Sequence, residues 1–140
     1  MVDDVILNKI ANVERCLERI NTEFSGLGNA ELETNYTVQD SIILNLERAS
    51  QATIDLSSHI IKTKNWGLPQ SSREVFDLLE KEKVISPETS KNMKNMVGFR
   101  NPAVHDYTKL NISVIQSIVE NNLADFTVFT TQILKYFEEV

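Results

Sequence analysis

Inward-facing positions recur along three long segments of the chain at alternating spacings of four and three residues. That repeat is typical of one apolar face of an α-helix. The segments span residues 3–24, 38–61 and 113–138. Their inward positions are Ile6, Ile10, Val13, Leu17, Ile20 and Phe24, then Ile42, Leu46, Ala49, Thr53, Leu56 and Ile60, and finally Ile115, Val119, Asn122, Phe126, Phe129, Ile133 and Tyr136. The pattern therefore predicts three long amphipathic helices.

The second of these helices has the widest apolar face, because Ile43, Ile54 and Ile61 lie beside its stripe. We expect it to pack against more than one partner. A loop of residues 25–36 joins it to the first helix, so the two are predicted to form an antiparallel pair. Asn122 is the polar residue in the third stripe. It either sets the register with a partner helix or bonds to nearby backbone.

Shorter helices are predicted between the second and third long segments. One spans residues 72–81 and follows a connector in which Trp66 is expected to be a packing anchor. Another begins at Ser86 and Pro87, because serine is a preferred N-cap and proline is tolerated at the first helical position. Thr37 is predicted to cap the second long helix in the same way.

The helix that begins at Pro87 meets a second proline, Pro102, near its other end. Proline removes a backbone donor, clashes one turn back and disfavours helical torsions at the preceding residue. We therefore expect a break or sharp kink between Asn101 and Ala103. On an unbroken helix, Arg100 and His105 would point about 140° apart, whereas a kink would let both face one cleft.

Together these elements predict an all-α fold, an up-and-down bundle of four to five helices that forms a single domain over residues 1–140. The length is sufficient for one core, and the 41% hydrophobic content argues against disorder. Cys16 is the single cysteine and cannot form an internal disulfide, which suits a reducing cytoplasm. We see no signal peptide and no apolar run near the roughly 20 residues that span a bilayer. A cytoplasmic protein with no membrane partner is expected.

Charge is distributed unevenly along the chain, whose net charge is −6. Residues 1–58 and 112–140 carry −6 and −3, whereas residues 59–111 carry nine basic and six acidic groups. The overall charge argues against non-specific binding of nucleic acid by the whole surface. The basic part is either a solvated helix face or a local RNA-binding surface. Its candidate RNA-binding residues are Lys91, Lys94 and Lys109.

One short stretch concentrates the polar chemistry of the basic part. It reads Arg100-Asn101-Pro102-Ala103-Val104-His105-Asp106-Tyr107. An arginine followed by a histidine at this spacing resembles the motif of the HEPN superfamily, and the trailing tyrosine resembles its HepT toxin branch. The lead-in segments 76–79, 84–87 and 96–99 are also similar to that branch, as are the flanking helices. The resemblance thus covers essentially the whole chain.

The motif residues suit the cleavage of an RNA phosphodiester. Histidine titrates near neutral pH, so His105 can act as general base or general acid. Arg100 offers a permanent, forked set of donors for phosphate oxygens, and Asn101 can orient the phosphate or the imidazole. No metal or cofactor is expected, because the motif has no second histidine, no cysteine cluster and no carboxylates at ligand spacing.

The resemblance implies more than the residues alone. HEPN ribonucleases are homodimers whose two motifs share a groove, and the HepT branch is implied to be a ribonuclease toxin of type VII toxin–antitoxin systems. Its partner is a minimal nucleotidyltransferase antitoxin, MntA, which transfers AMP to the motif tyrosine. In this chain that tyrosine is Tyr107. An added phosphate near His105 would block the groove and repel RNA.

Other interpretations of the same residues stay open. An isolated arginine and histidine can simply be a helix-end charge and a cap. The chain could also be a non-catalytic helical partner of a nucleotidyltransferase, or a purely structural dimerisation bundle. His59, near a helix C-terminus, suits the helix dipole and is assigned no chemistry. Glu47 and Arg48 are expected to be a surface pair, and Cys16 a small buried filler.

Overall fold

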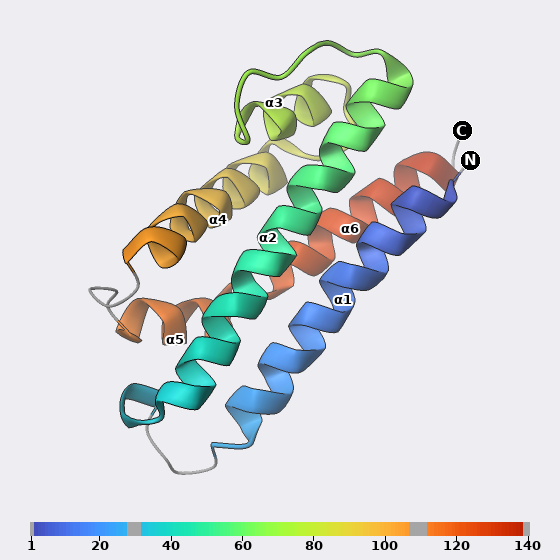
Figure 1. Cartoon of the computed structure of the whole chain (residues 1–140). Helices are drawn as coiled ribbons and strands as arrows, with labels where there is room; N and C mark the ends of the chain where they lie inside the picture. The colour runs from blue at the N-terminus through green and yellow to red at the C-terminus, as the bar shows by residue number, and fades with distance from the viewer. Residues whose placement is uncertain (1, 28–31, 107–111, 139–140) are drawn as a thin grey trace.

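The computed structural model describes residues 2–27, 32–106 and 112–138, with the backbone alone for 99–106. All regular elements in these ranges are helical (Figure 1). They are α1 (Asp4–Ser25), the 3-10 helix η1 (Leu32–Thr34), α2 (Tyr36–Lys64), α3 (Glu74–Lys81), α4 (Pro87–Asp106), α5 (Ile112–Asn121) and α6 (Ala124–Glu138). The predicted all-α bundle is confirmed. In the same ranges, no helix is long and apolar enough to cross a bilayer.

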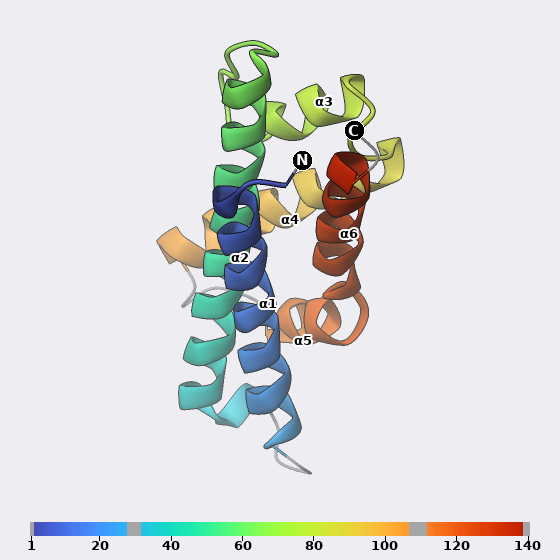
Figure 2. The same cartoon turned by 90° about the vertical axis from the view of Figure 1, so that its right-hand side faces the viewer.

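The antiparallel pair of α1 and α2 forms one side of the molecule (Figure 1). The predicted stripes of both helices are buried, apart from Phe24, which is only partly buried. The other side of α2 packs against α3 and α4, which confirms that its wide apolar face serves several partners. Figure 2 shows α6 on the far side of the core from α2, next to α4.

Aromatic contacts close the core where α2, α3 and α6 meet. Phe76 and Phe129 are fully buried, and their rings meet edge to face with centroids 5.8 Å apart. Trp66 meets Tyr136 in the same way, with centroids 6.2 Å apart, so its predicted role as a packing anchor is confirmed. Such pairs contribute about 0.5–1.5 kcal/mol beyond the burial of their area.

The start of α2 corrects the predicted cap at Thr37. The helix begins at Tyr36, and the side chain of Asn35 accepts a hydrogen bond from the Val38 N–H at 3.1 Å. Asparagine caps a helix at least as well as threonine. The turn before it is fixed by Gln39, whose side-chain amide donates to the carbonyls of Leu32 and Glu33, both at 2.8 Å.

The predicted single helix over residues 113–138 is wrong, because the chain turns at Asn122 and Leu123 between α5 and α6. The carbonyls of these two residues accept short-range bonds from Asp125 and Phe126, at 3.1 and 3.2 Å. The Asn122 side chain donates to the Asp125 carboxylate at 3.4 Å, so its partner here is a side chain rather than the expected backbone group. The apolar stripe survives the turn, which explains why periodicity alone could not reveal it.

The break expected between Asn101 and Ala103 is also wrong, because α4 continues from Pro87 to Asp106, whereas the alternative of a kink within the helix stays a prediction. A proline inside a helix removes one hydrogen bond and costs about 3 kcal/mol. That cost need not end the helix when its earlier turns are fixed by packing. Met93, Met96 and Val97 of α4 are all buried in the core.

The N-terminal end of α1 is tied to α2 through Asp3 and His59. One carboxylate oxygen of Asp3 caps α1 by accepting the Ile6 N–H at 2.8 Å, and the other lies 2.8 Å from Nε2 of His59. His59 therefore serves a cross-helix contact rather than the end of its own helix. Figure 1 places both termini at this end of the molecule, away from the C-terminal end of α4.

We expect Asp3→Ala to lower the free energy of unfolding by about 1 kcal/mol near neutral pH, because the cap is lost. Asp3→Asn keeps a capping oxygen and loses the charge, so its effect should be smaller.

The stabilisation by Asp3 should also depend on pH. The hydrogen bond from His59, followed by that from the Ile6 N–H, lowers the pKa of the Asp3 carboxyl from its ordinary value of 3.8. The charge therefore stabilises the fold above the unfolded-state pKa, and this contribution is lost as pH falls through the folded-state pKa. Denaturation curves should show the gap between wild type and Asp3→Asn narrowing below about pH 4; a constant gap would contradict this.

Candidate active site on α4

The first half of α4 is fixed by a cap at its start and by hydrogen bonds to two neighbouring helices. Ser86 caps it by accepting the Thr89 N–H at 3.1 Å, as predicted, and the Ser86 N–H donates to the side chain of Gln132 in α6 at 3.0 Å. The buried Ser90 hydroxyl donates to the carbonyl of Phe76 in α3 at 3.3 Å. These contacts hold α4 against α3 and α6 before the chain reaches the motif.

The motif lies on the last two turns of α4, where Arg100, Asn101 and His105 occupy helical backbone. Helical spacing places these positions on two faces. Positions 93, 97, 100 and 104 follow at four, three and four, so Arg100 continues the stripe begun by the buried Met93 and Val97. Positions 94, 98, 101 and 105 form a neighbouring stripe that holds Asn101 and His105.

α4 has no break between Arg100 and His105. On a straight helix these two residues would be about 140° apart around the axis, so the prediction that both face one cleft of a single chain depends on the expected kink. Tyr107 and Lys109 lie outside the described residues, as do the side chains of the motif. Their roles stay predictions.

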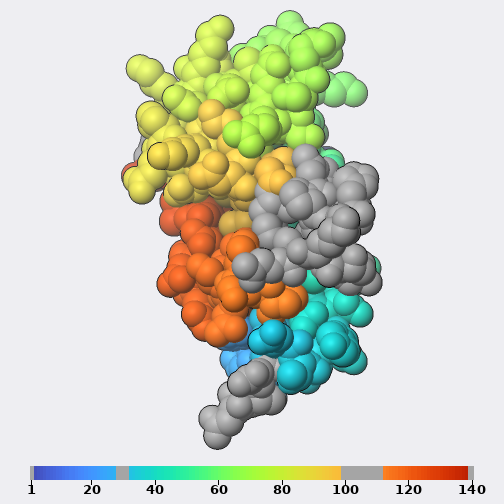
Figure 3. Space-filling view, turned by 90° about the vertical axis from the view of Figure 1, so that its left-hand side faces the viewer, coloured from blue at the N-terminus to red at the C-terminus, as the bar shows by residue number. Residues whose placement is uncertain are grey.

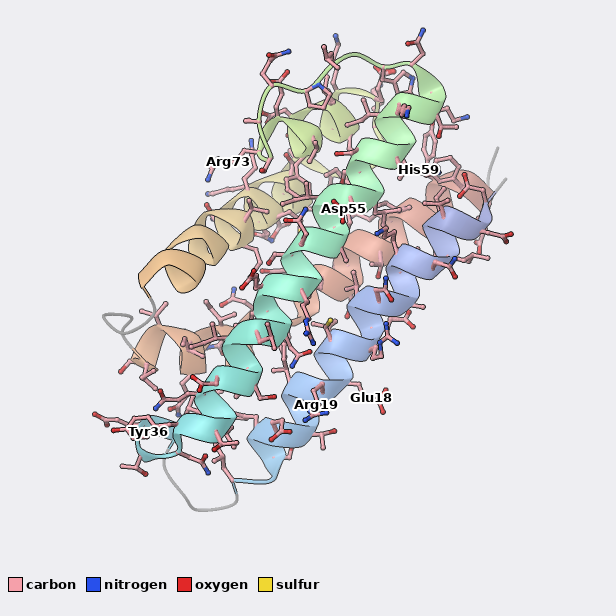
Figure 4. All side chains as sticks on the ribbon, in the orientation of Figure 1. Glu18, Arg19, Tyr36, Asp55, His59 and Arg73 are labelled. Carbon is pink, nitrogen blue, oxygen red and sulfur yellow. The ribbon has the colours of Figure 1, made fainter. Side chains whose placement is uncertain are left out.

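Arg73 is a cation beside this helix that the sequence did not single out. It precedes α3 and is exposed, and its Nη1 donates to the carbonyl of Lys94 at 3.1 Å. A Cβ on Gly98 would lie only 3.2 Å from the same nitrogen, so the guanidinium rests on Gly98. Figure 4 shows Arg73 reaching toward α4. Since Lys94 and Gly98 share the stripe of Asn101 and His105, Arg73 lies on that face of the helix.

The predicted lysines differ in their surroundings. Lys94 pairs with Asp77 of α3, with Nζ and Oδ1 2.6 Å apart. This pair neutralises one of the positive charges around the motif and ties α3 to α4. Lys91 is exposed on the first half of α4.

A small pocket opens on another side of α4, facing α5 and the start of α6. Its volume is about 220 Å³, and its lining is Asn92, Asn95, Met96, Val114, Ile118, Asn122 and Asp125. On the face drawn in Figure 3, yellow α4 lies above the orange residues of α5. No single segment of the sequence indicated this pocket, because three helices contribute to it.

The remaining residues considered from the sequence lie elsewhere. His59 is at the far end of α2 from the end of α4 (Figure 4). Cys16 is buried between helices, and burial raises the pKa of its thiol, which confirms a filler rather than a reactive group. Glu47 is half-buried and Arg48 exposed in the middle of α2.

Comparisons with known proteins agree with this architecture. A family model described as ribonuclease HepT-like matches residues 13–133. The mRNA nuclease HepT of Shewanella oneidensis is 42% identical over 128 residues, which cover 91% of this chain and 95% of that protein. The tRNA nuclease HepT of Aphanizomenon flos-aquae is 28% identical over 91 residues, covering 65% of this chain and 62% of the other.

A solved structure is similar over nearly the whole chain. It is the tri-AMPylated HEPN toxin of Shewanella oneidensis in complex with the MNT antitoxin. Its TM-score is 0.90 at 41% sequence identity, and the match covers 96% of this chain and 99% of that one.

We expect Gly98→Ala to raise the free energy of unfolding by up to about 1 kcal/mol, because glycine is a poor helix former. The new Cβ would displace Arg73, whose exposed hydrogen bond contributes about 0.5–1.5 kcal/mol at most. Chemical denaturation of Gly98→Ala in the wild-type and Arg73→Ala backgrounds separates the two effects. The gain should be larger where Arg73 is already absent; an equal gain in both backgrounds would mean that Arg73 does not rest on Gly98.

Proposed function

This chain belongs to the ribonuclease HepT-like family, and from that membership we propose that it is a metal-independent endoribonuclease toxin. It acts in a type VII toxin–antitoxin pair in the cytoplasm and is neutralised by AMP transfer to Tyr107. The observation that carries the proposal is the presence of Arg100, Asn101 and His105 at motif spacing on the last turns of α4. A chain that was only a binding partner would not need that set of residues.

The motif supplies the groups that RNA cleavage needs. His105 takes the proton from the ribose 2′-hydroxyl or returns one to the leaving oxygen, a contribution of about 10²–10⁴-fold. Arg100 stabilises the negative charge that develops on the phosphate in the transition state. Asn101 shares the stripe of His105 and orients the phosphate or the ring.

A homodimer follows from the placement of these residues on α4. One histidine does not easily serve as both base and acid. Positions 100 and 105 also lie on different faces of one continuous helix. A two-fold axis beside α4 would bring the His105 face of one copy next to the Arg100 face of its partner and supply two histidines. The shared groove is then a property of the pair.

Arg73 adds a permanent cation to the same face of α4. Its guanidinium has five donors, and one of them is used on the Lys94 carbonyl. We assign the others to a phosphate next to the one that is cleaved. Lys91 and Lys109 supply further positive charge at lower specificity, whereas the bond of Lys94 to Asp77 reduces its contribution.

The antitoxin partner is a minimal nucleotidyltransferase of the MntA type. A phenol has a pKa of about 10 and is a poor nucleophile at neutral pH, so the partner must supply the base, the metal ion and ATP. The AMP phosphate on Tyr107 would lie two residues from His105 and repel the RNA backbone.

We expect Arg100→Ala and His105→Ala each to lower RNA cleavage by at least about 10²-fold, with no effect of EDTA. Circular dichroism and light scattering should show an unchanged fold and dimer. Arg73→Gln should retain cleavage but reduce the slope of log affinity against log salt by about 0.7, because one phosphate contact is lost. Inhibition by EDTA would overturn the metal-free mechanism. Wild-type rates in His105→Ala would favour the alternative, a non-catalytic partner of the nucleotidyltransferase.

We expect the chain to gain mass in AMP units on Tyr107 and to lose ribonuclease activity when incubated with ATP, magnesium and the cognate nucleotidyltransferase. Tyr107→Phe should escape both effects, since it lacks the acceptor hydroxyl. Mass spectrometry of tryptic peptides and an RNA cleavage assay measure the two results. Tyr36→Phe is the matched control, because Tyr36 is 72% exposed at the start of α2 and offers a phenol outside the motif. If Tyr107→Phe is silenced as fully as wild type, inhibition works by occlusion instead.

A further inference from the structure

The pocket between α4, α5 and α6 combines an apolar surface with several oxygen acceptors. Met96 is buried, Ile118 is half-buried, and Val114 is 44% exposed at the edge. The volume of about 220 Å³ is below the roughly 300–1,000 Å³ of pockets for drug-sized ligands. A single flat ring system is the kind of ligand that such a surface and size accept.

Asp125 determines the polarity of this pocket. Its two carboxylate oxygens accept the side-chain amides of Asn92 and Asn122, each at 3.4 Å. An ionised carboxylate can only accept, so both asparagines must turn a nitrogen toward it and their carbonyl oxygens away. The pocket therefore presents acceptors to a ligand, and the long bonds to Asp125 are weak enough to be exchanged.

The negative charge of Asp125 disfavours a phosphate in this pocket, and the acceptor oxygens beside it favour a nucleobase. The described lining has one negative charge and no basic residue, so an anion would be repelled. Carboxylate and amide oxygens instead accept from an exocyclic amine, such as N4 of cytosine or N6 of adenine. Uracil presents the O4 carbonyl at the corresponding place, which would face the same acceptors unfavourably, and offers only its single N3–H as a donor.

The pocket is close to the motif along the same helix. Met96 precedes Arg100 by four residues, or about 6 Å of helix rise. An RNA whose scissile phosphate lies at Arg100 could therefore place a neighbouring base here. Bases of single-stranded RNA can be splayed out and recognised through hydrogen bonds to their edges.

We propose that this pocket binds an amino-bearing base (cytosine, adenine or guanine) of a nucleotide beside the scissile phosphate and discriminates against uracil. The proposal rests on the proposed ribonuclease function and deepens it, because it gives the enzyme a base preference. Asp125 is the specificity-determining residue, and Asn92 and Asn122 position its carboxylate and add their own oxygens.

The first test does not depend on catalysis. The full-length chain, labelled with ¹⁵N, is titrated with cytidine and with uridine, which differ in an amine against a carbonyl at C4 and in the proton that uridine carries on N3. We expect saturable shifts of the side-chain amides of Asn92, Asn95 and Asn122, with cytidine binding at least about tenfold more tightly. Asp125→Asn should remove most of that difference, whereas Glu120→Gln, an equal charge change on α5 outside the pocket lining, should preserve it. Equal binding of both nucleosides, or no shift at these amides, would overturn the proposal.

The second test uses two RNA oligonucleotides that differ only in cytosine or uracil next to the cut site. Wild type and Glu120→Gln should cleave the cytosine RNA at least about tenfold faster, and Asp125→Asn should cleave both at similar rates. Val114→Trp, which fills the exposed edge, should also remove the preference. Equal cleavage of the two RNAs by wild type would overturn the proposal while leaving the ribonuclease function intact. If neither RNA is cut, the proposed function fails, and the nucleoside titration still decides whether the pocket selects its base.

Discussion

The structure depends on the anchoring of the first half of α4. Ser86 is bonded to Gln132 of α6, Ser90 to the carbonyl of Phe76 in α3, and Met93 and Val97 are buried against the rest of the bundle. With these turns fixed, the register of the following turns is set by the helix itself. The motif is therefore positioned by the core, although it lies at the end of the helix.

Much of the fold could be predicted from the sequence, because burial imposes a helical repeat that is visible residue by residue. The stripes of α1 and α2 and the cap at Ser86 followed from local rules. Besides the cap of α2, which is Asn35 rather than Thr37, two errors concern helix continuity. Asn122 sits in an uninterrupted stripe but ends α5, whereas Pro102 should disrupt a helix and does not. The turn at Asn122 is made by short-range hydrogen bonds to Asp125 and Phe126, which an apolar repeat does not reveal, and at Pro102 the cost of one proline did not end a helix whose earlier turns are buried.

Part of the candidate site could likewise be predicted from the sequence, and part could not. Arg100, Asn101 and His105 are recognisable because they are close in sequence and their side-chain chemistry is distinctive. Arg73 could not be found that way, since its contact with the Lys94 carbonyl spans 21 residues. The glycine beneath it, Gly98, was the available clue, because a glycine within a helix often marks a close approach. No local pattern in the sequence could have indicated the pocket, because its lining residues come from three helices.

The position of the two chain ends has a practical consequence. Asp3, tied to His59, and the end of α6 lie at the same end of the bundle, away from the last turns of α4 (Figures 1 and 2). A fluorescent protein or affinity tag fused to either terminus would therefore lie away from the motif. Because α1 begins and α6 ends at this one end of the bundle, a linker could join them in a circular permutation, with new termini in the connector between α2 and α3. Such a rearranged chain would keep the bundle and present the last turns of α4 unchanged.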